Sequence, residues 1–262
     1  MTIDAAHTAD CVRVEVDSDG IAVVEFERGK ANYFDAAMIE GIADAYDSLG
    51  SDPRARVIVL CAAGRNFCAG MDFGSRSDIV PTVSEIYDNA VRLFESPLPV
   101  VAAVQGATVG GGLGLAMSAD FRVGAPSAWV SANFAALGIH HGFGLTVTLP
   151  SAVGEQVAAD LLLSGRRITA DEAQHRGVFD RLSVTDDSLR AEAIAWAREF
   201  ARCAPLAVRS IRKTLRGRAL VDRVRSAVEH ELAQQTPLFE TTDFVEGIAA
   251  ARERRAPQFS AR

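Results

Sequence analysis

The chain has no apolar run of the roughly 18 residues that a membrane-spanning helix needs. Residues 1–10 are polar and lack the basic and then apolar pattern of a signal peptide, so we expect them to form a disordered tail. An excess of basic residues is missing too, because 27 Lys and Arg stand against 34 Asp and Glu, for a net charge of −7. This balance argues against general nucleic-acid binding, although it leaves open an anionic ligand at a local site.

Motifs for metal binding and for covalent catalysis are absent as well. The sequence has no G-x-S-x-G motif of a serine hydrolase, and no G-K-[S/T] follows its glycine run, as a phosphate-binding P-loop would require. No C-x-x-C pair and no cluster with histidine occurs among the four cysteines, which are Cys11, Cys61, Cys68 and Cys203. We therefore expect no bound metal, and reduced thiols in a cytoplasmic protein.

The sequence does contain ample material for a core, because 48% of its residues are hydrophobic. Alternating or apolar runs predict a hairpin at residues 12–16 and 21–26 and further strands at 57–61, 100–104, 120–124 and 128–130. Asp35 can cap a helix, residues 82–85 and 169–172 have capping-box spacing, and the chain reads as almost entirely helical from Gly154. This alternation predicts an α/β fold built from ββα units on a mixed sheet.

Two glycine-bearing loops carry the strongest functional signal. One follows the strand at residues 100–104 and places Gly110, Gly111 and Gly112 at the start of a small-residue helix. The other follows the strand at 57–61 and reads Phe67-Cys68-Ala69-Gly70-Met71-Asp72. Glycine lets the backbone approach a ligand closely, and the first turn of a helix offers unpaired N–H groups and a partial positive charge. Such a site can stabilise a developing oxyanion. The alternative is close packing of the glycine-rich helix against its strand.

Taken together, the two loops resemble those of the crotonase (enoyl-CoA hydratase/isomerase) superfamily, and the resemblance extends over about residues 12–262. It implies a crotonase-like spiral of ββα repeats over residues 11–195. It also implies a C-terminal helical region, residues 196–262, that builds homotrimers, usually paired into hexamers. The implied substrate is a CoA thioester, with no cofactor beyond the coenzyme A that the substrate carries. Met71 and Gly111 would be the two backbone N–H donors to the thioester oxygen.

Further site residues come with this resemblance. The loop residues expected to line the substrate site are Ala69, Gly70, Asp72, Phe73 and Gly110. Phe134 and Phe143 are expected to form apolar walls of the acyl pocket, together with the variable stretch at residues 73–94. Arg28 and Lys30 lie in the family's early loop and are expected to meet coenzyme A phosphates. The alternative for these two cations is an ordinary solvated loop.

The sequence departs from the family at its catalytic carboxylates. Family hydratases use two glutamates, and the corresponding positions here are Gly114 and Phe134. Histidine titrates near neutral pH, so we predict that His141, or failing that His140, moves the proton. The alternative is that one histidine packs in the core and the other hydrogen-bonds a carbonyl. Weaker candidates on the pocket-forming helix are Glu85, Tyr87 and Asp88.

The predicted activity is proton transfer or water addition through an enolate of a CoA thioester. Two rival interpretations follow from the missing glutamates. One is a hydrolase of acyl-CoA or of C–C bonds on the same fold. The other is a catalytically silent subunit that binds acyl-CoA.

Overall fold

The computed structural model describes residues 11–73 and 79–262, so residues 1–10, expected to be a disordered tail, lie outside the described part together with residues 74–78. Within that part, the central sheet has six strands in the order β1-β2-β3-β4-β6-β9. They are β1 (Val12–Val16), β2 (Ile21–Phe26), β3 (Val57–Ala62), β4 (Val100–Val104), β6 (Phe121–Gly124) and β9 (Arg181–Leu182). β1 is antiparallel to β2, which confirms the predicted hairpin, and the other neighbours are parallel.

The central strands β3 and β4 are buried along their whole length. Parallel strands that are covered on both faces read as continuous apolar runs, which is the pattern of these two segments. A smaller sheet carries the glycine-rich loop, and among the described residues its strand order is β5-β7-β8. These strands are β5 (Ala107–Val109), β7 (Trp129–Ser131) and β8 (Arg167–Thr169).

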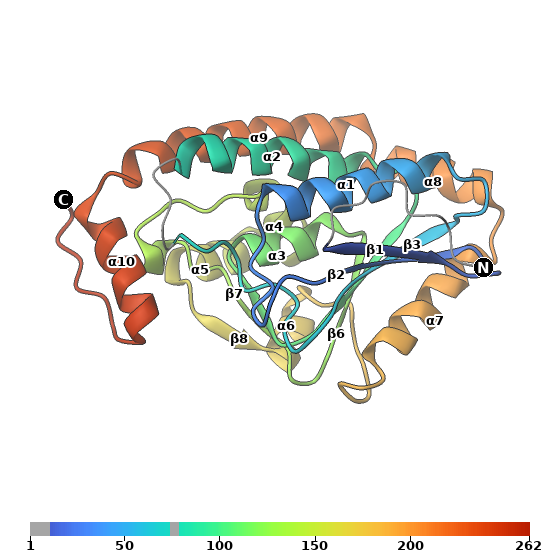
Figure 1. Cartoon of the computed structure of the whole chain (residues 1–262), viewed down its shortest axis with the longest axis horizontal. Helices are drawn as coiled ribbons and strands as arrows, with labels where there is room; N and C mark the ends of the chain where they lie inside the picture. Colours follow the sequence, from blue (N-terminus) through green and yellow to red (C-terminus); the bar gives the residue numbers. More distant parts are fainter. Residues whose placement is uncertain (1–10, 74–78) are drawn as a thin grey trace.

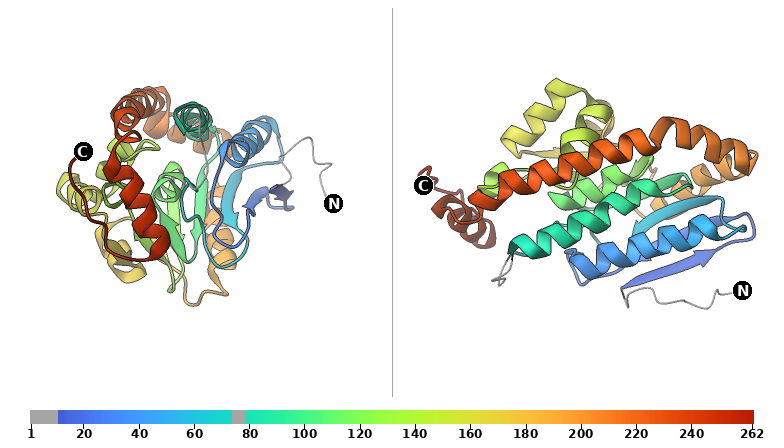
Figure 2. Two further views of the ribbon diagram at one scale, coloured as in Figure 1. Left: turned by 60° about the vertical axis from the view of Figure 1, so that its left-hand side comes forward. Right: turned by 90° about the horizontal axis from the view of Figure 1, so that it is seen from above.

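Helices cover both faces of the central sheet (Figure 1). α1 (Ala36–Ser51), α2 (Ile79–Glu95) and α9 (Arg218–Leu238) run side by side over one face, while α7 (Leu189–Ala201) packs against β3 and β4 (Figure 2). The remaining helices are α3 (Gly111–Ser118), a 3-10 turn at Ala135–Leu137, α4 (Leu145–Val153), α5 (Glu155–Ser164), α6 (Ala170–Arg176), α8 (Pro205–Arg216) and α10 (Thr242–Glu253). Within the described ranges, every helix is too short or too polar to span a bilayer.

Two predicted helix caps are confirmed and a third is wrong. The side chain of Asp35 accepts the backbone N–H of Met38 at the start of α1, and Thr169 accepts the N–H of Glu172 at the start of α6. α2, in contrast, begins at Ile79, so Thr82 lies inside its first turn and does not cap it.

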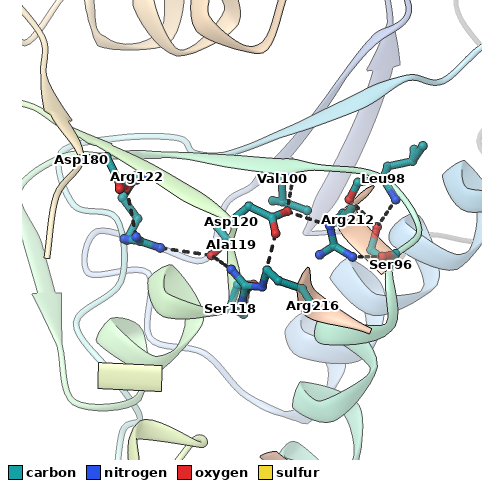
Figure 3. Close-up of polar contacts among 10 residues, drawn as sticks. All are labelled: Ser96, Leu98, Val100, Ser118, Ala119, Asp120, Arg122, Asp180, Arg212 and Arg216. Carbon is teal, nitrogen blue, oxygen red and sulfur yellow. Dashed lines mark hydrogen bonds and ion pairs between the residues drawn. The ribbon is translucent and has the colours of Figure 1, made fainter. Parts of the chain in front are cut away.

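Buried ion pairs hold α8 against the sheet (Figure 3). Arg212 Nε donates to Asp120 Oδ2 over 2.9 Å, and Arg216 Nε lies 3.3 Å from Oδ1 of the same carboxylate. The backbone N–H of Val100, the first residue of β4, also donates to Oδ2, over 2.7 Å. The side chains of Arg212 and Asp120 are 7% and 8% exposed. A buried charge is tolerated when opposite charges and hydrogen bonds compensate it, as they do for this carboxylate.

Candidate active site

The two glycine-bearing loops lie side by side and run in the same direction. Cys68 forms a parallel bridge with Thr108, in which the Cys68 N–H donates to the Ala107 carbonyl (3.0 Å) and the Val109 N–H donates to the Cys68 carbonyl (2.9 Å). Met71 and Gly111 each lie three residues beyond this bridge, Met71 on the first loop and Gly111 at the start of α3 on the second. The structure therefore brings together two segments that are about 40 positions apart in the sequence, a separation that follows from the paired residue numbers.

Glycine is required where these segments approach each other. A Cβ atom on Gly70, which has φ of 95°, would lie 3.0 Å from the Val109 carbonyl oxygen. A Cβ atom on Gly112 would overlap the carbonyl group of Cys68. Any side chain at these positions would push the two loops apart, so Gly70 and Gly112 serve the close packing of two backbones, which is the alternative given above for the glycine-rich segment. Cys68 itself is fully buried, and burial raises the pKa of its thiol to about 12.

The backbone N–H groups of Met71 and Gly111 have no other use in the described part of the chain. Gly111 is the first residue of α3, so the helix contains no acceptor for its N–H. No backbone hydrogen bond within the described residues involves the N–H of Met71. Both residues line one cavity of about 230 Å³. These are the features of two donors that are free to bind an oxygen atom inside the cavity.

A buried amide fastens the early loop to the donor loop. The side-chain Nδ2 of Asn32 donates to the carbonyls of Ala63 and Asn66, each over 2.8 Å, and its Oδ1 accepts the N–H of Arg28 over 2.7 Å. Asn32 is 1% exposed and has a positive φ of 48°, a conformation that asparagine adopts more readily than most residues. The sequence reads as an ordinary loop at this position, and no local pattern marks the residue.

The cavity walls are largely aromatic. Predicted site residues on these walls are Ala69, Gly70, Asp72, Phe73, Gly110, Phe134 and Phe143, together with the two donors. Lining residues that the sequence reasoning missed are Tyr33, Phe34, Gln235, Phe239, Ile248 and Arg252. Gln235 lies on α9, Phe239 directly follows α9, and Ile248 and Arg252 lie on α10, so the helical C-terminal region closes the cavity of its own chain. Helix periodicity in the sequence does not reveal which distant loop a helix will cover.

A phenylalanine fills the space beside Gly114, one of the two positions at which family hydratases carry glutamate. A Cβ atom on Gly114 would overlap Cβ of Phe143 and lie 2.7 and 2.8 Å from its ring atoms Cγ and Cδ1. Phe143 is 1% exposed and has φ of 63°, which is rare for a bulky residue and costs backbone strain. The ring also packs edge-on against Phe34, with centroids 5.7 Å apart. Position 114 therefore has no room for a carboxylate in this protein.

The two predicted histidines are hydrogen-bonded outside this cavity and are not among the described residues that line it. His140 Nδ1 donates to the carbonyl of His141 over 2.7 Å, and the two rings stack. His141 Nε2 lies 2.8 Å from Thr146 Oγ1. That hydroxyl donates its hydrogen to Glu231 (2.6 Å), so the histidine nitrogen must be the donor to Thr146. Burial, together with repulsion from the neighbouring histidines, lowers the pKa of His141 to about 4, which leaves this ring neutral at pH 7.

The carboxylate of Glu231 caps the start of α4. It accepts the backbone N–H groups of Gly144 (2.8 Å) and Thr146 (2.9 Å) in addition to the Thr146 hydroxyl. Burial raises the pKa of this carboxyl, and these three hydrogen bonds work in the opposite direction. The group is fully used in positioning α4, where a negative charge at the helix N-terminus is favourable.

The two predicted phosphate contacts lie apart from the cavity. Arg28 forms an ion pair with Asp35, the cap of α1, and its side chain is 43% exposed. Lys30 borders a separate surface hollow of about 1260 Å³ that also contains Arg65, Arg167 and Arg190. The aspartates Asp186 and Asp187 line the same hollow, so its charge is mixed.

Two main-chain N–H groups without partners at one cavity of an α/β fold are the arrangement that an enzyme needs to polarise a carbonyl group. Comparison with known sequences agrees: the family model described as enoyl-CoA hydratase/isomerase matches residues 17–262. The probable enoyl-CoA hydratase 2, mitochondrial, of Arabidopsis thaliana is 30% identical over an alignment of 255 positions that covers 95% of this chain and 84% of that protein. The methylglutaconyl-CoA hydratase, mitochondrial, of Homo sapiens is 33% identical over an alignment of 267 positions that covers 96% of this chain and 78% of that protein.

Among solved structures, an enoyl-CoA hydratase from Mycobacterium avium subsp. paratuberculosis superposes with a TM-score of 0.85 at 27% identity, covering 96% of this chain and 99% of that one. The chain belongs to the enoyl-CoA hydratase/isomerase family, also called the crotonase superfamily. The predicted crotonase-like fold and the predicted enzyme class are confirmed.

Proposed function

We propose that the protein holds the carbonyl oxygen of a CoA thioester between the backbone N–H groups of Met71 and Gly111 and so stabilises an enolate. The observation that supports this proposal is that the two loops pair through Cys68 and Thr108 and that Met71 and Gly111, whose N–H groups have no partner among the described residues, line one cavity. Forming an enolate moves negative charge onto the thioester oxygen. Fixed donors stabilise that charge without reorganising, and one such donor is typically worth about 10²–10³ in rate.

The proposed reaction is hydration or isomerisation of a compact unsaturated acyl group, including branched ones. The aromatic cavity of about 230 Å³ supports a compact group, since an apolar cavity of about 150 Å³ already holds benzene. Relatives named enoyl-CoA hydratase and methylglutaconyl-CoA hydratase support the same reaction class. Proton transfer by His141 or His140 stays a prediction. Neither histidine is among the described residues that line the cavity, and each ring nitrogen named above already has a hydrogen-bond partner. Lys30, at the edge of its hollow, is the better supported of the two proposed phosphate contacts, because Arg28 is paired with Asp35.

We also propose that copies of the chain associate through α8 as a trimer or a pair of trimers. The usual distribution of charged and apolar residues is reversed on this helix. Its buried side chain is Arg212, whereas Leu206, Ile211 and Leu215 are 83%, 60% and 75% exposed. Large apolar side chains on one exposed face are typical of a subunit interface. Replacing Ile211 with Glu is expected to lower the mass observed by sedimentation. A cytoplasmic location is part of the proposal, supported by four free cysteines.

The Gly111 donor can be tested with two substitutions that both add a side chain but differ in whether the backbone N–H is kept. Both Gly111→Ala and Gly111→Pro introduce a Cβ atom that meets the ring of Phe34, but only proline removes the N–H. Proline is tolerated at the first position of a helix, so α3 should still form. We expect kcat/KM with an enoyl-CoA to fall about 10²–10³-fold further in the proline variant than in the alanine variant. Equal losses in the two variants would refute a role for this donor.

The rival reactions are separated by the product that appears. Hydration consumes the enoyl absorbance and releases no thiol, whereas thioester hydrolysis releases free coenzyme A, which a thiol reagent detects. Turnover of no enoyl-CoA or acyl-CoA in a panel, together with a thermal shift on adding acyl-CoA, would support the catalytically silent subunit and refute the proposed reaction.

A further inference from the structure

Few residues that line the cavity can exchange a proton. Among the described lining residues, the ones with an ionisable side chain are Tyr33, Asp72, Tyr87 and Arg252. Tyr33 is 43% exposed, and Asp72 and Arg252 are also exposed, so these three stand at the solvent side of the cavity. Tyr87 is 7% exposed and belongs to the buried core. It is the ionisable residue of this set that an enclosed acyl group would meet.

The hydroxyl group of Tyr87 is held in one place by three parts of the fold. Tyr87 lies on α2, and its O–H donates to Gln235 Oε1 on α9 over 2.9 Å. The Nε2 of Gln235 donates in turn to the backbone carbonyl of His140 over 2.9 Å. Because Gln235 is itself 2% exposed and fixed by that carbonyl, it is well placed to position the phenol oxygen.

The hydroxyl group of Tyr87 occupies the space that a side chain at Gly142 would need. A Cβ atom on Gly142 would overlap the hydroxyl oxygen of Tyr87. Gly142 does not have a positive φ, so its backbone conformation is open to other residues and does not itself require glycine. The residue is small because the phenol needs the room. This space adjoins Phe143, whose ring packs against Gly114 and lies 3.6 Å from the Cβ position of the donor residue Gly111.

We propose that Tyr87 gives the proton to the α-carbon of the thioester enolate, taking over work that a carboxylate at position 114 or 134 cannot do in this chain. This inference rests on the proposed function above. Rotation about the phenol C–O bond turns the hydrogen from Gln235 toward the cavity and leaves the ring in place. Gln235 acts as the positioning residue.

The proton balance closes on this single group when water adds to an enoyl-CoA. The water oxygen forms a bond to the β-carbon, and the π electrons of the C=C bond move toward the carbonyl to give the enolate. The O–H bond of Tyr87 breaks and its proton bonds to the α-carbon. The proton lost by the added water returns to the phenolate oxygen, so Tyr87 ends the cycle protonated. Burial raises the pKa of Tyr87, which keeps the hydroxyl protonated at neutral pH.

The experiment compares two tyrosines that are both buried. Tyr87→Phe removes the hydroxyl oxygen of a residue that lines the cavity. Tyr46→Phe removes the same atom from a core residue of α1, whose hydroxyl has no hydrogen-bond partner among the described residues. Hydration of crotonyl-CoA and of a branched enoyl-CoA is measured for the native protein and both variants. We expect kcat of Tyr87→Phe to fall about 10²–10⁴-fold, with KM close to that of Tyr46→Phe. The thermal midpoint is expected to fall only modestly, because Tyr87→Phe leaves Gln235 Oε1 without its donor.

The outcomes separate this inference from the function on which it rests. If Tyr87→Phe keeps the kcat of Tyr46→Phe, the proton comes from another group and the inference is refuted, while the proposed hydration stands. If the native protein and Tyr46→Phe neither hydrate nor isomerise any enoyl-CoA, the proposed function is refuted and the role of Tyr87 is refuted with it. A loss of kcat in Tyr87→Phe alone supports both.

Discussion

Replacing Gly114 with alanine should destabilise the native protein but not a Phe143→Gly variant. In the native protein the new Cβ atom would overlap Cβ of Phe143 and crowd two ring atoms at 2.7 and 2.8 Å. The ring is 1% exposed and braced by Phe34, so it has little room to move. Overpacking of this kind costs about 1–3 kcal/mol, whereas glycine-to-alanine in an unobstructed helix gains about 0.5–1 kcal/mol.

The Phe143→Gly variant removes all three crowding atoms and suits the positive φ of 63°. In that background Gly114→Ala should raise the free energy of unfolding. The coupling between the two positions is then about 1–3 kcal/mol, well above the 0.3–0.5 kcal/mol scatter of independent sites. Denaturant unfolding of the four proteins at one protein concentration measures it. Additive effects within that scatter would mean that Phe143 is not what excludes a side chain from position 114.

Three further predictions concern the loops, the half-buried His141 and the core thiol. Asn32→Ala leaves the Ala63 and Asn66 carbonyls without their donor, so it should lower the free energy of unfolding by about 1–3 kcal/mol and reduce kcat/KM; a value near zero would contradict the fastening role. His141 has its pKa depressed to about 4 against about 6.5 when unfolded, so the unfolded state binds its proton first and stability is lost as pH falls from about 6.5 toward 4. Between pH 7.5 and 5 the loss of stability is at most about 2 kcal/mol, because the carboxylate of Glu231 lies 4.0 Å from the His141 ring and opposes the lowering of its pKa. His141→Gln should flatten this part of the curve of stability against pH. An unchanged curve would refute the assignment to His141. Cys68, fully buried and with its pKa raised to about 12, should resist a thiol reagent in the folded protein while the exposed Cys203 reacts, as mass spectrometry would show.

The strands and the two donor loops are predictable because their causes are local. The runs at β3 and β4 are apolar throughout since both faces are covered, and glycines mark the places where two backbones meet. Helix α4 lacks such a signal, because its sequence is rich in β-branched residues and contains Pro150. Its helical state depends on tertiary contacts, including the cap that Glu231 supplies from α9.

The rest of the site depends on contacts between distant segments. Gln235 reads in the sequence as one polar residue on an amphipathic helix, yet it positions Tyr87 from 148 residues away. Asn32 reads as a loop residue but joins three segments. The missing glutamate at position 114 is visible in the sequence, whereas its physical cause, the ring of Phe143, is visible only in the fold.

The length of α9 has a mechanical consequence. Its 21 residues form one rod of about 31 Å, which starts beside the ion-paired α8 and ends at the acyl cavity with Gln235 and Phe239. A stiff rod transmits a displacement from one end to the other. A subunit that packs against Leu206 and Leu215 of α8 would therefore also be expected to influence the position of Gln235 and Phe239 at the cavity.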